Sequence, residues 1–379
     1  MKRLVKGTFS AAIILFLSTT AFALPRFAIM TGMQCLNCHV NPTGGELRNS
    51  YGGSDFVDSH LTLIPAHSSD FEFNPKLGQD ILIGGDVRFQ YLYDGQSKSS
   101  TFQSMEGAIY LSIHLFTSTR LYARYDFANA SVLGPAAYEL YGLYTFSGGD
   151  TWIKVGAFEP SYGVRLDDHT AYTRGGNYGI LQGIPLVGLI FSPDYRDLGI
   201  EAGSKCGSFL LTADITNGDG LSNFNFASQK AAIGRVEYLL HGAINLMLGA
   251  SGYYTGGLKM YGVQGGIGIA KRLSIIGEFD WAKSLPTVVP MNATSNAAFV
   301  EASYEIENGL FGFGRFDYFK EFVGGPTYYR YVIGTDIYPI PHLDLMPEVR
   351  FNTTNVVGSP GYYGSHPVVE ALIQSHIYF

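Results

Sequence analysis

The sequence of 379 residues predicts an all-β fold, a transmembrane antiparallel β-barrel. Tyrosine, phenylalanine and glycine are abundant, at 26, 26 and 47 residues, and no apolar run after residue 25 is long enough for a spanning helix. Many short segments alternate polar and apolar side chains, as strands with one polar and one apolar face do. Short and longer connections alternate between these segments, an arrangement typical of barrels in bacterial outer membranes. A soluble all-β protein is the competing class.

Residues 1–23 have the features of a secretory signal peptide. Three basic residues precede an apolar run over residues 11–17, and residues 21–23 (Ala-Phe-Ala) form a small-x-small cleavage site. The apolar run is too short to span a bilayer. We therefore expect the mature chain to leave the cytoplasm. It then carries 22 Lys and Arg against 32 Asp and Glu, which argues against nucleic acid as a partner.

Residues 35–39 read Cys-Leu-Asn-Cys-His, the C-x-x-C-H signature of c-type haem attachment. Two thiols at this spacing can each add to one vinyl group of the same haem, and the histidine that follows can bind the iron. A zinc half-site, a redox pair or a chance match are the alternatives, but zinc would need a second pair of ligands and Cys206 stands alone. We predict one covalent haem c, attached at Cys35 and Cys38, with His39 as the proximal iron ligand.

The iron also needs a sixth ligand or an open site. His60 is the first candidate for the distal metal ligand because it lies near the motif in sequence. A methionine in this position would raise the reduction potential. The other candidates, by type, are His67, His114, His376, Met30 and Met33.

Residues 24–80 form the segment that bears the haem motif. Fewer than sixty residues leave a marginal core, and residues 40–45 after the motif disfavour a helix. A haem needs more apolar cover than this segment offers. We therefore expect the segment to be a small c-type haem plug, inserted into the barrel from the periplasmic side.

Residues 81–379 are expected to form the barrel. In residues 120–127, Arg, Tyr, Arg and Asp share one face, and Leu, Ala, Tyr and Phe share the other. Such alternation suits a polar lumen and an apolar outer wall. The longest connection, residues 161–197, is expected to be a solvated loop. Sixteen strands are predicted, with fourteen or eighteen left open, at approximately 82–93, 104–115, 119–127, 135–146, 151–160, 198–205, 208–216, 229–240, 243–254, 259–270, 272–283, 296–306, 310–320, 327–338, 343–353 and 367–379.

The last of these segments ends on Phe379 and resembles the closing strand of bacterial outer-membrane barrels. Sixteen strands enclose more room than side chains fill, so a barrel of this size has an aqueous channel or holds a plug. The signal peptide and the barrel together predict the outer membrane of a Gram-negative-type bacterium, with its lipid around the wall.

With Cys35, Cys38, His39 and the following Asn-Pro-Thr-Gly-Gly of residues 41–45 ahead of a barrel, the chain resembles the outer-membrane cytochrome–porin fusion family. Its members join a monohaem c-type cytochrome to a β-barrel, and the best known oxidise ferrous iron at the cell surface. The resemblance implies a single-haem conduit between an extracellular electron donor or acceptor and periplasmic c-type cytochromes. It also implies thioether bonds at both cysteines and a proximal bond from the histidine.

We therefore expect an electron-transfer protein, with ferrous iron oxidase activity left open and no direction of electron flow implied. The alternative function is a diffusion porin whose haem segment serves as a periplasmic sensor or tether. A third class, a soluble periplasmic haem enzyme on a β scaffold, would require the protein to be found in the soluble fraction.

Overall fold

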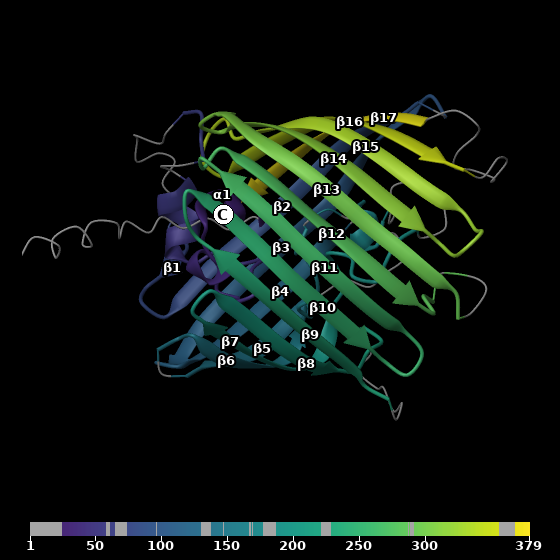
Figure 1. Cartoon of the computed structure of the whole chain (residues 1–379). Helices are drawn as coiled ribbons and strands as arrows, with labels where there is room; N and C mark the ends of the chain where they lie inside the picture. Colours follow the sequence, from purple (N-terminus) through teal and green to yellow (C-terminus); the bar gives the residue numbers. More distant parts are fainter. Residues whose placement is uncertain are drawn as a thin grey trace, which may run out of the picture.

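Sixteen antiparallel strands, β2 to β17, form a closed barrel (Figure 1). The computed structural model describes residues 25–57, 61–64, 74–95, 97–129, 138–146, 148–166, 168, 170–176, 187–220, 229–286, 288, 292–355 and 368–379. Each strand pairs with the next in sequence, and β17 pairs with β2 to close the sheet. The predicted all-β class and the predicted number of strands are confirmed.

The bounds of the strands agree closely with the alternating segments of the sequence. β14 has the predicted bounds, and the largest difference is at β3, which begins at Ser99 because Ser99 pairs with Asp94 across a tight connection. The strands are β2 (Ile81–Asp94), β3 (Ser99–Phe116), β4 (Thr119–Asn129), β5 (Tyr138–Thr145), β6 (Thr151–Phe158), β7 (Asp197–Cys206), β8 (Phe209–Thr216), β9 (Ala231–Leu240), β10 (Ile244–Tyr254), β11 (Lys259–Ile269), β12 (Leu273–Lys283), β13 (Thr294–Glu307), β14 (Leu310–Lys320), β15 (Thr327–Ile337), β16 (Leu343–Thr354) and β17 (Val368–Tyr378).

Alternation along each strand separates a buried inner face from an exposed outer face. On β4, Arg124 and Asp126 are buried in the lumen, whereas Tyr125 and Phe127 are 59% and 55% exposed on the outside. The same pattern recurs around the wall, so charged side chains line the interior and large apolar side chains cover the exterior. This is the sense of alternation predicted for a barrel with a polar lumen.

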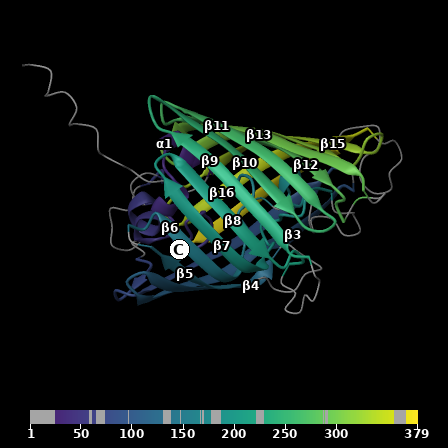
Figure 2. The ribbon, with the colours of Figure 1, turned by 60° about the horizontal axis from the view of Figure 1, so that its bottom comes forward.

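The N-terminal segment lies inside the end of the barrel that carries the short turns, where it is coloured purple (Figures 1 and 2). It contains the helix α1 (Pro25–Thr31), a 3-10 turn (Cys35–Asn37), a π-helical turn (Tyr51–Asp55) and the short strand β1 (Lys76–Leu77), which pairs with β2. Ile29 packs against Met247 and Ile276 of the wall. Residues 25–57 of the predicted plug are therefore in the lumen, whereas β1 extends the wall beside β2, and the haem itself stays a prediction.

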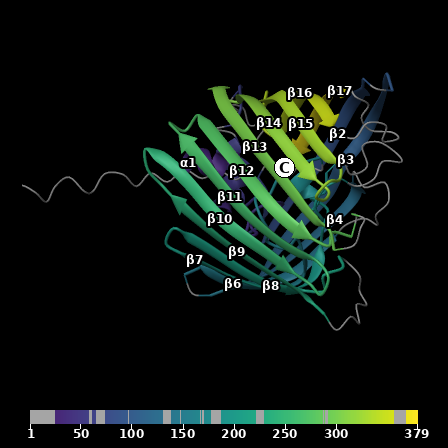
Figure 3. The ribbon, with the colours of Figure 1, turned by 45° about the vertical axis from the view of Figure 1, so that its right-hand side comes forward.

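The described residues between β6 and β7 also turn into the lumen, and we call them the inward loop: 159–166, 168, 170–176 and 187–196. Tyr172 and Phe191 of this loop are buried against the wall residues Tyr253 and Phe319. The expectation of a solvated loop was wrong for its described residues, because apolar side chains such as Val187 and Leu189 find an apolar lining there. The short turn between β11 and β12 lies at the end of the barrel that holds α1 (Figure 3).

None of the helices in the described ranges has the length and hydropathy needed to cross a bilayer.

Candidate functional site

The C-x-x-C-H motif forms a single tight turn. The backbone N–H groups of Cys38 and His39 both donate to the carbonyl oxygen of Cys35, at 3.1 and 3.0 Å. One carbonyl thus anchors the second cysteine and the histidine. The turn presents the two thiols and the imidazole from five consecutive residues, as covalent haem attachment requires.

The chain after this turn folds back on it as a short hairpin, which fixes the backbone of the turn. His39 and Arg48 face each other in an isolated antiparallel bridge. The backbone N–H of Asn49 donates to the carbonyl of Cys38 at 2.8 Å, and its side-chain Nδ2 donates to the carbonyl of Asn37, also at 2.8 Å. Asn49 therefore fixes the motif through both its backbone and its side chain.

Two glycines give the cysteines room. Gly44 has φ of +91°, and a Cβ there would lie 2.9 Å from Sγ of Cys35. At Gly52, a Cβ would lie 2.8 Å from Cβ of Cys38. Because real Cβ atoms avoid such distances, any side chain at either position would displace a motif cysteine. The glycine pair that follows the motif in the sequence could indicate the role of Gly44, whereas no sequence pattern indicated the role of Gly52.

Cys35 and His39 line a cavity in the lumen, with a void of about 2020 Å³ when the adjoining open solvent is included. Cys38 is 0% exposed and packs against Met33 and Tyr51. The charged residues that line the cavity are Arg26, Arg48, Arg88, Arg124, Arg165, Arg315, Arg350, Glu46, Asp86, Glu106, Glu159, Asp168, Asp194, Glu301, Asp336, Asp344 and Glu348. The apolar lining includes Phe27, Phe56, Val57, Leu61, Met105, Phe313, Met346 and Leu372.

Burial governs the chemistry of both thiols. Desolvation raises the pKa of Cys35, helped by the negative charge of Glu237. Desolvation and the neighbouring Cys35 raise the pKa of Cys38 to about 12. Both groups therefore stay protonated near neutral pH, and thiolate chemistry at these positions is suppressed in the folded chain.

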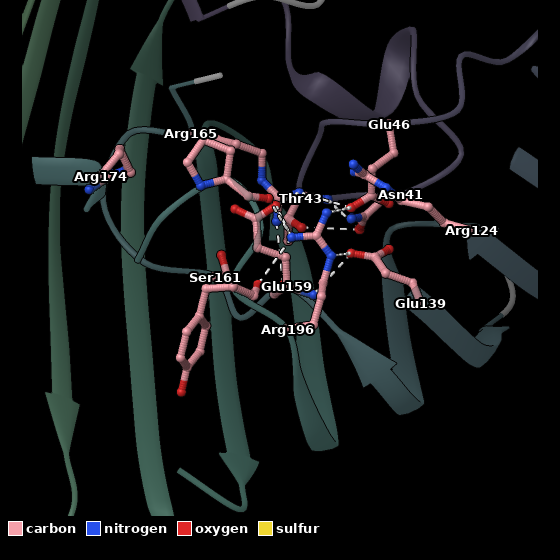
Figure 4. A network of polar contacts seen from close by, with 12 residues as sticks. Asn41, Thr43, Glu46, Arg124, Glu139, Glu159, Ser161, Arg165, Arg174 and Arg196 are labelled. Carbon is pink, nitrogen blue, oxygen red and sulfur yellow. Dashed lines mark hydrogen bonds and ion pairs between the residues drawn. The ribbon is translucent and has the colours of Figure 1, made fainter. Parts of the chain in front are cut away.

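A cluster of charges joins the N-terminal segment to the wall and to the inward loop (Figure 4). Glu46 lies 3.6 Å from Arg165 and 3.9 Å from Arg196, measured between carboxylate oxygen and guanidinium nitrogen. Arg165 contacts Glu159 at 3.0 Å, and Arg196 forms an ion pair with Glu139 of β5. Burial alone would raise the pKa of Glu46, but a hydrogen bond with Glu139 and the two arginines outweigh it and lower that pKa to about 2.

Further anchors seat the N-terminal segment at the rim. The side chain of Asn245, at the start of β10, donates to the carbonyl oxygens of Ile29 and Met30 at 2.9 and 3.0 Å. Arg26 forms an ion pair with Asp336 of β15. The segment is thus held by the wall on several sides of the lumen.

The inward loop is held by its own buried ion pairs. Arg174 pairs with Glu278 of β12 at 2.7 Å, and the backbone N–H of Val164 donates to the same carboxylate at 2.6 Å. Asp168, which the sequence placed in a solvated loop, pairs with Arg315 of β14 at 2.6 Å.

The predicted distal ligands fall in different places. His60 and His67 lie outside the described residues. His376 lines the same cavity as His39, and its Nε2 is 2.7 Å from Oδ1 of Asp86. Met30 and Met33 are buried in packing clusters, and His114 is half-buried on β3. Of the described candidates, the structure brings only His376 to the cavity.

Comparisons with known proteins concern the barrel. No protein-family model matches the sequence, and no curated protein matches it. The chain is similar in structure to OprB of Pseudomonas putida, with a TM-score of 0.58 and 9% identity over 79% of this chain and 94% of that one. It is similar to OmpT of Vibrio cholerae, with a TM-score of 0.56 and 13% identity over 80% of this chain and 99% of that one. It is also similar to an anion-selective porin from Comamonas acidovorans, with a TM-score of 0.54 and 12% identity over 79% of this chain and 99% of that one. At such identities the likeness shows the fold alone, so the chain has a porin-like β-barrel fold.

Proposed function

We propose that the chain is a porin-like protein of the outer membrane of a Gram-negative-type bacterium, and that it carries one covalent haem c and passes electrons across that membrane. The supporting observation is the position of the motif turn. Cys35 and His39 open onto a cavity in the lumen, inside the wall of the barrel. A redox group at that place would be shielded from lipid by the strands.

The residues around the turn fit such a group. Two thiols and an imidazole come from one turn, Gly44 leaves space against Cys35, and both apolar and cationic side chains line the cavity. Cys35 and Cys38 would hold the haem, His39 would bind its iron, and arginines such as Arg48 suit its carboxylate groups. When bound, the haem supplies an iron that takes up and gives up one electron.

The chain's own residues would position this group and exclude lipid and bulk solvent from it. Asn49 and Arg48 fix the backbone of the motif turn. The N-terminal segment fills one end of the lumen, and the inward loop fills part of the other. The partners of this function are periplasmic c-type cytochromes and an extracellular donor or acceptor such as ferrous iron, which the acidic balance of the mature chain would attract. Ferrous iron oxidase activity is part of this proposal.

A second candidate function is diffusion through the lumen, with the haem segment as a periplasmic sensor or tether. The comparisons favour this candidate, because the similar structures include porins and an outer-membrane channel. The charged lumen also suits hydrated solutes. Among the described residues, however, two insertions occupy the interior, which supports a low conductance.

The first experiment tests for the haem. The full chain is expressed in a bacterium that has the c-type haem maturation machinery and is purified from outer membranes. We expect a covalent haem that resists extraction and a haem absorption band. Cys35→Ser with Cys38→Ser should abolish both, and the control Cys206→Ser should leave both unchanged. A colourless protein of unchanged mass would contradict the proposal and leave the porin candidate.

The second experiment separates conduit from pore. In planar bilayers we expect little single-channel current from the full chain. Arg174→Ala, which removes the ion pair with Glu278, should loosen the inward loop and raise the current. A large open-channel current from the unmodified chain would favour the diffusion porin. If haem is present, adding ferrous iron to the oxidised protein tests iron as the donor, and a haem spectrum unchanged at every pH would exclude iron.

A further inference from the structure

Three carboxyl groups and two guanidinium groups meet where the N-terminal segment, the wall and the inward loop come together (Figure 4). Oxygens of Glu46, Glu139 and Glu159 all lie within 4.8 Å of one another. The side chain of Glu46 is 2% exposed, and that of Glu139 is 0% exposed. Arg165 and Arg196 are the cations in contact with them.

The charges of this cluster do not balance. Among the described residues, Arg165 and Arg196 leave one of the three carboxylates uncompensated. The next guanidinium along the wall, Arg124, is already bonded to Glu106 at 2.8 Å and to Asp126 at 2.5 Å. A buried net charge is costly unless a proton or another cation neutralises it.

Glu46 also lacks a hydrogen-bond donor, just as the cluster lacks a positive charge. Apart from the carboxyl group of Glu139, no group among the described residues is placed to donate a hydrogen bond to either carboxylate oxygen of Glu46. Oxygens of Glu139 and Glu46 lie within 4.8 Å of each other. Two carboxylates cannot form a hydrogen bond with each other, because neither has a donor.

We propose that Glu46 and Glu139 share one proton, and that this pair is a buried proton-binding site joining the N-terminal segment to the barrel wall. One proton supplies both the missing positive charge and the missing donor. A divalent metal ion fits less well, since it would add two charges where one is lacking and would compete with the guanidinium groups for the same oxygens. The argument does not depend on the presence of a haem.

Because of the shared proton, the contact between the N-terminal segment and the barrel wall should weaken at high pH. Loss of the proton would leave two facing carboxylates that repel each other across the contact between segment and wall. The groups that face the pair are Arg124 and Tyr122 of β4, Tyr141 of β5, Glu159, Arg165 and Arg196. Arg165 and Arg196 oppose the repulsion but fall one charge short of the three carboxylates, and Arg124 is already paired with Glu106 and Asp126.

Infrared spectroscopy of the full chain at neutral pH tests the site. A protonated carboxyl group has a carbonyl stretching band that shifts in deuterated water. We expect Glu139→Gln to remove one such band and Glu46→Gln to remove the same one, because either change balances the remaining charges. The exposed control Glu307→Gln should remove none. Bands that are unchanged in both buried variants would overturn the proposal, as would a bound divalent metal lost from Glu139→Gln.

A second measurement does not depend on resolving one band. Amide hydrogen-exchange protection of residues 41–49 is followed as pH rises, corrected for the intrinsic exchange rate. The unmodified chain should lose protection when the shared proton leaves, whereas Glu139→Gln should keep it over the same range. Equal loss in both proteins would overturn the proposal. Folding of each variant is checked from the heat-dependent gel mobility of the barrel.

Discussion

Arg48 stands opposite His39 in an antiparallel bridge, and its guanidinium carbon lies 4.3 Å above the ring centre of Tyr378. The same side chain reaches Asp86 of β2 at 3.7 Å. Tyr378 ends β17, so Arg48 contacts the seam at which the first and last strands of the barrel close. The backbone of the motif histidine is thereby tied to the closure of the wall.

Replacing Arg48 should loosen the motif turn without opening the barrel. Arg48→Ala removes a partly buried cation–π contact, and we expect a local loss of about 1–2 kcal/mol. Hydrogen exchange of residues 35–49 should then be about tenfold faster, with the wall unchanged. Lys76→Ala, at an exposed position of β1, is the control and should have no effect. Unchanged exchange in Arg48→Ala would show that the contact does not hold the turn.

Gly44→Ala should disturb Cys35 more than backbone strain alone explains. The positive φ of Gly44 disfavours alanine by roughly 1–2 kcal/mol, and the added Cβ would also press on the thiol of Cys35. Gly148 is a matched control, since it has φ of +97° and nothing within 4 Å of its virtual Cβ. We expect Gly44→Ala to lower the yield of covalent haem severalfold and Gly148→Ala to leave it unaffected. Equal yields of covalent haem from the two variants would show that a Cβ at residue 44 does not displace Cys35.

Counting reactive thiols should report on the motif directly. In denaturant, a protein with both thioether bonds should show one thiol, that of Cys206, and a haem-free protein should show three. In the folded haem-free chain we expect exposed Cys206 to be alkylated first and Cys38 last, since burial and Cys35 raise the pKa of Cys38 to about 12. Labelling of Cys38 as fast as that of Cys206 near pH 8 would show that its site is open.

Protonation of Glu46 in acid should weaken the binding of the N-terminal segment to the barrel wall. The pKa of Glu46 is lowered to about 2 from 4.5, so the folded state favours the carboxylate. Its contribution to stability is fully present above the unfolded pKa and disappears as pH falls from about 4.5 to about 2. Hydrogen-exchange protection of residues 41–49 should fall over that window. In Glu46→Gln the fall should be absent, and a fall of the same size in that variant would assign it to another group.

Much of the fold was predictable because the signal is local. A strand alternates with a period of two residues, and this period can be read from each segment separately, as in residues 120–127. β14 was therefore placed with its observed bounds. The inward loop was misjudged because Val187 and Leu189 have no such period, and their burial depends on the wall residues that they meet.

The candidate site was predictable in part for a related reason. All three candidate residues of the motif lie within five consecutive positions, so spacing alone identifies Cys35, Cys38 and His39 as candidates. His60 was chosen by nearness along the chain, which says little about nearness in a barrel, and it lies outside the described residues. His376 reaches the cavity from the opposite end of the sequence.

By itself, the sequence determined the alternating strands, their polar face and the C-x-x-C-H motif, since each depends on the periodicity or spacing of neighbouring residues. Only the tertiary structure decided that the motif faces the lumen, that the inward loop fills part of it, and that Glu46 meets Glu139. These contacts join residues far apart in the chain, and closure of the sheet at β2 and β17 is what brings them together.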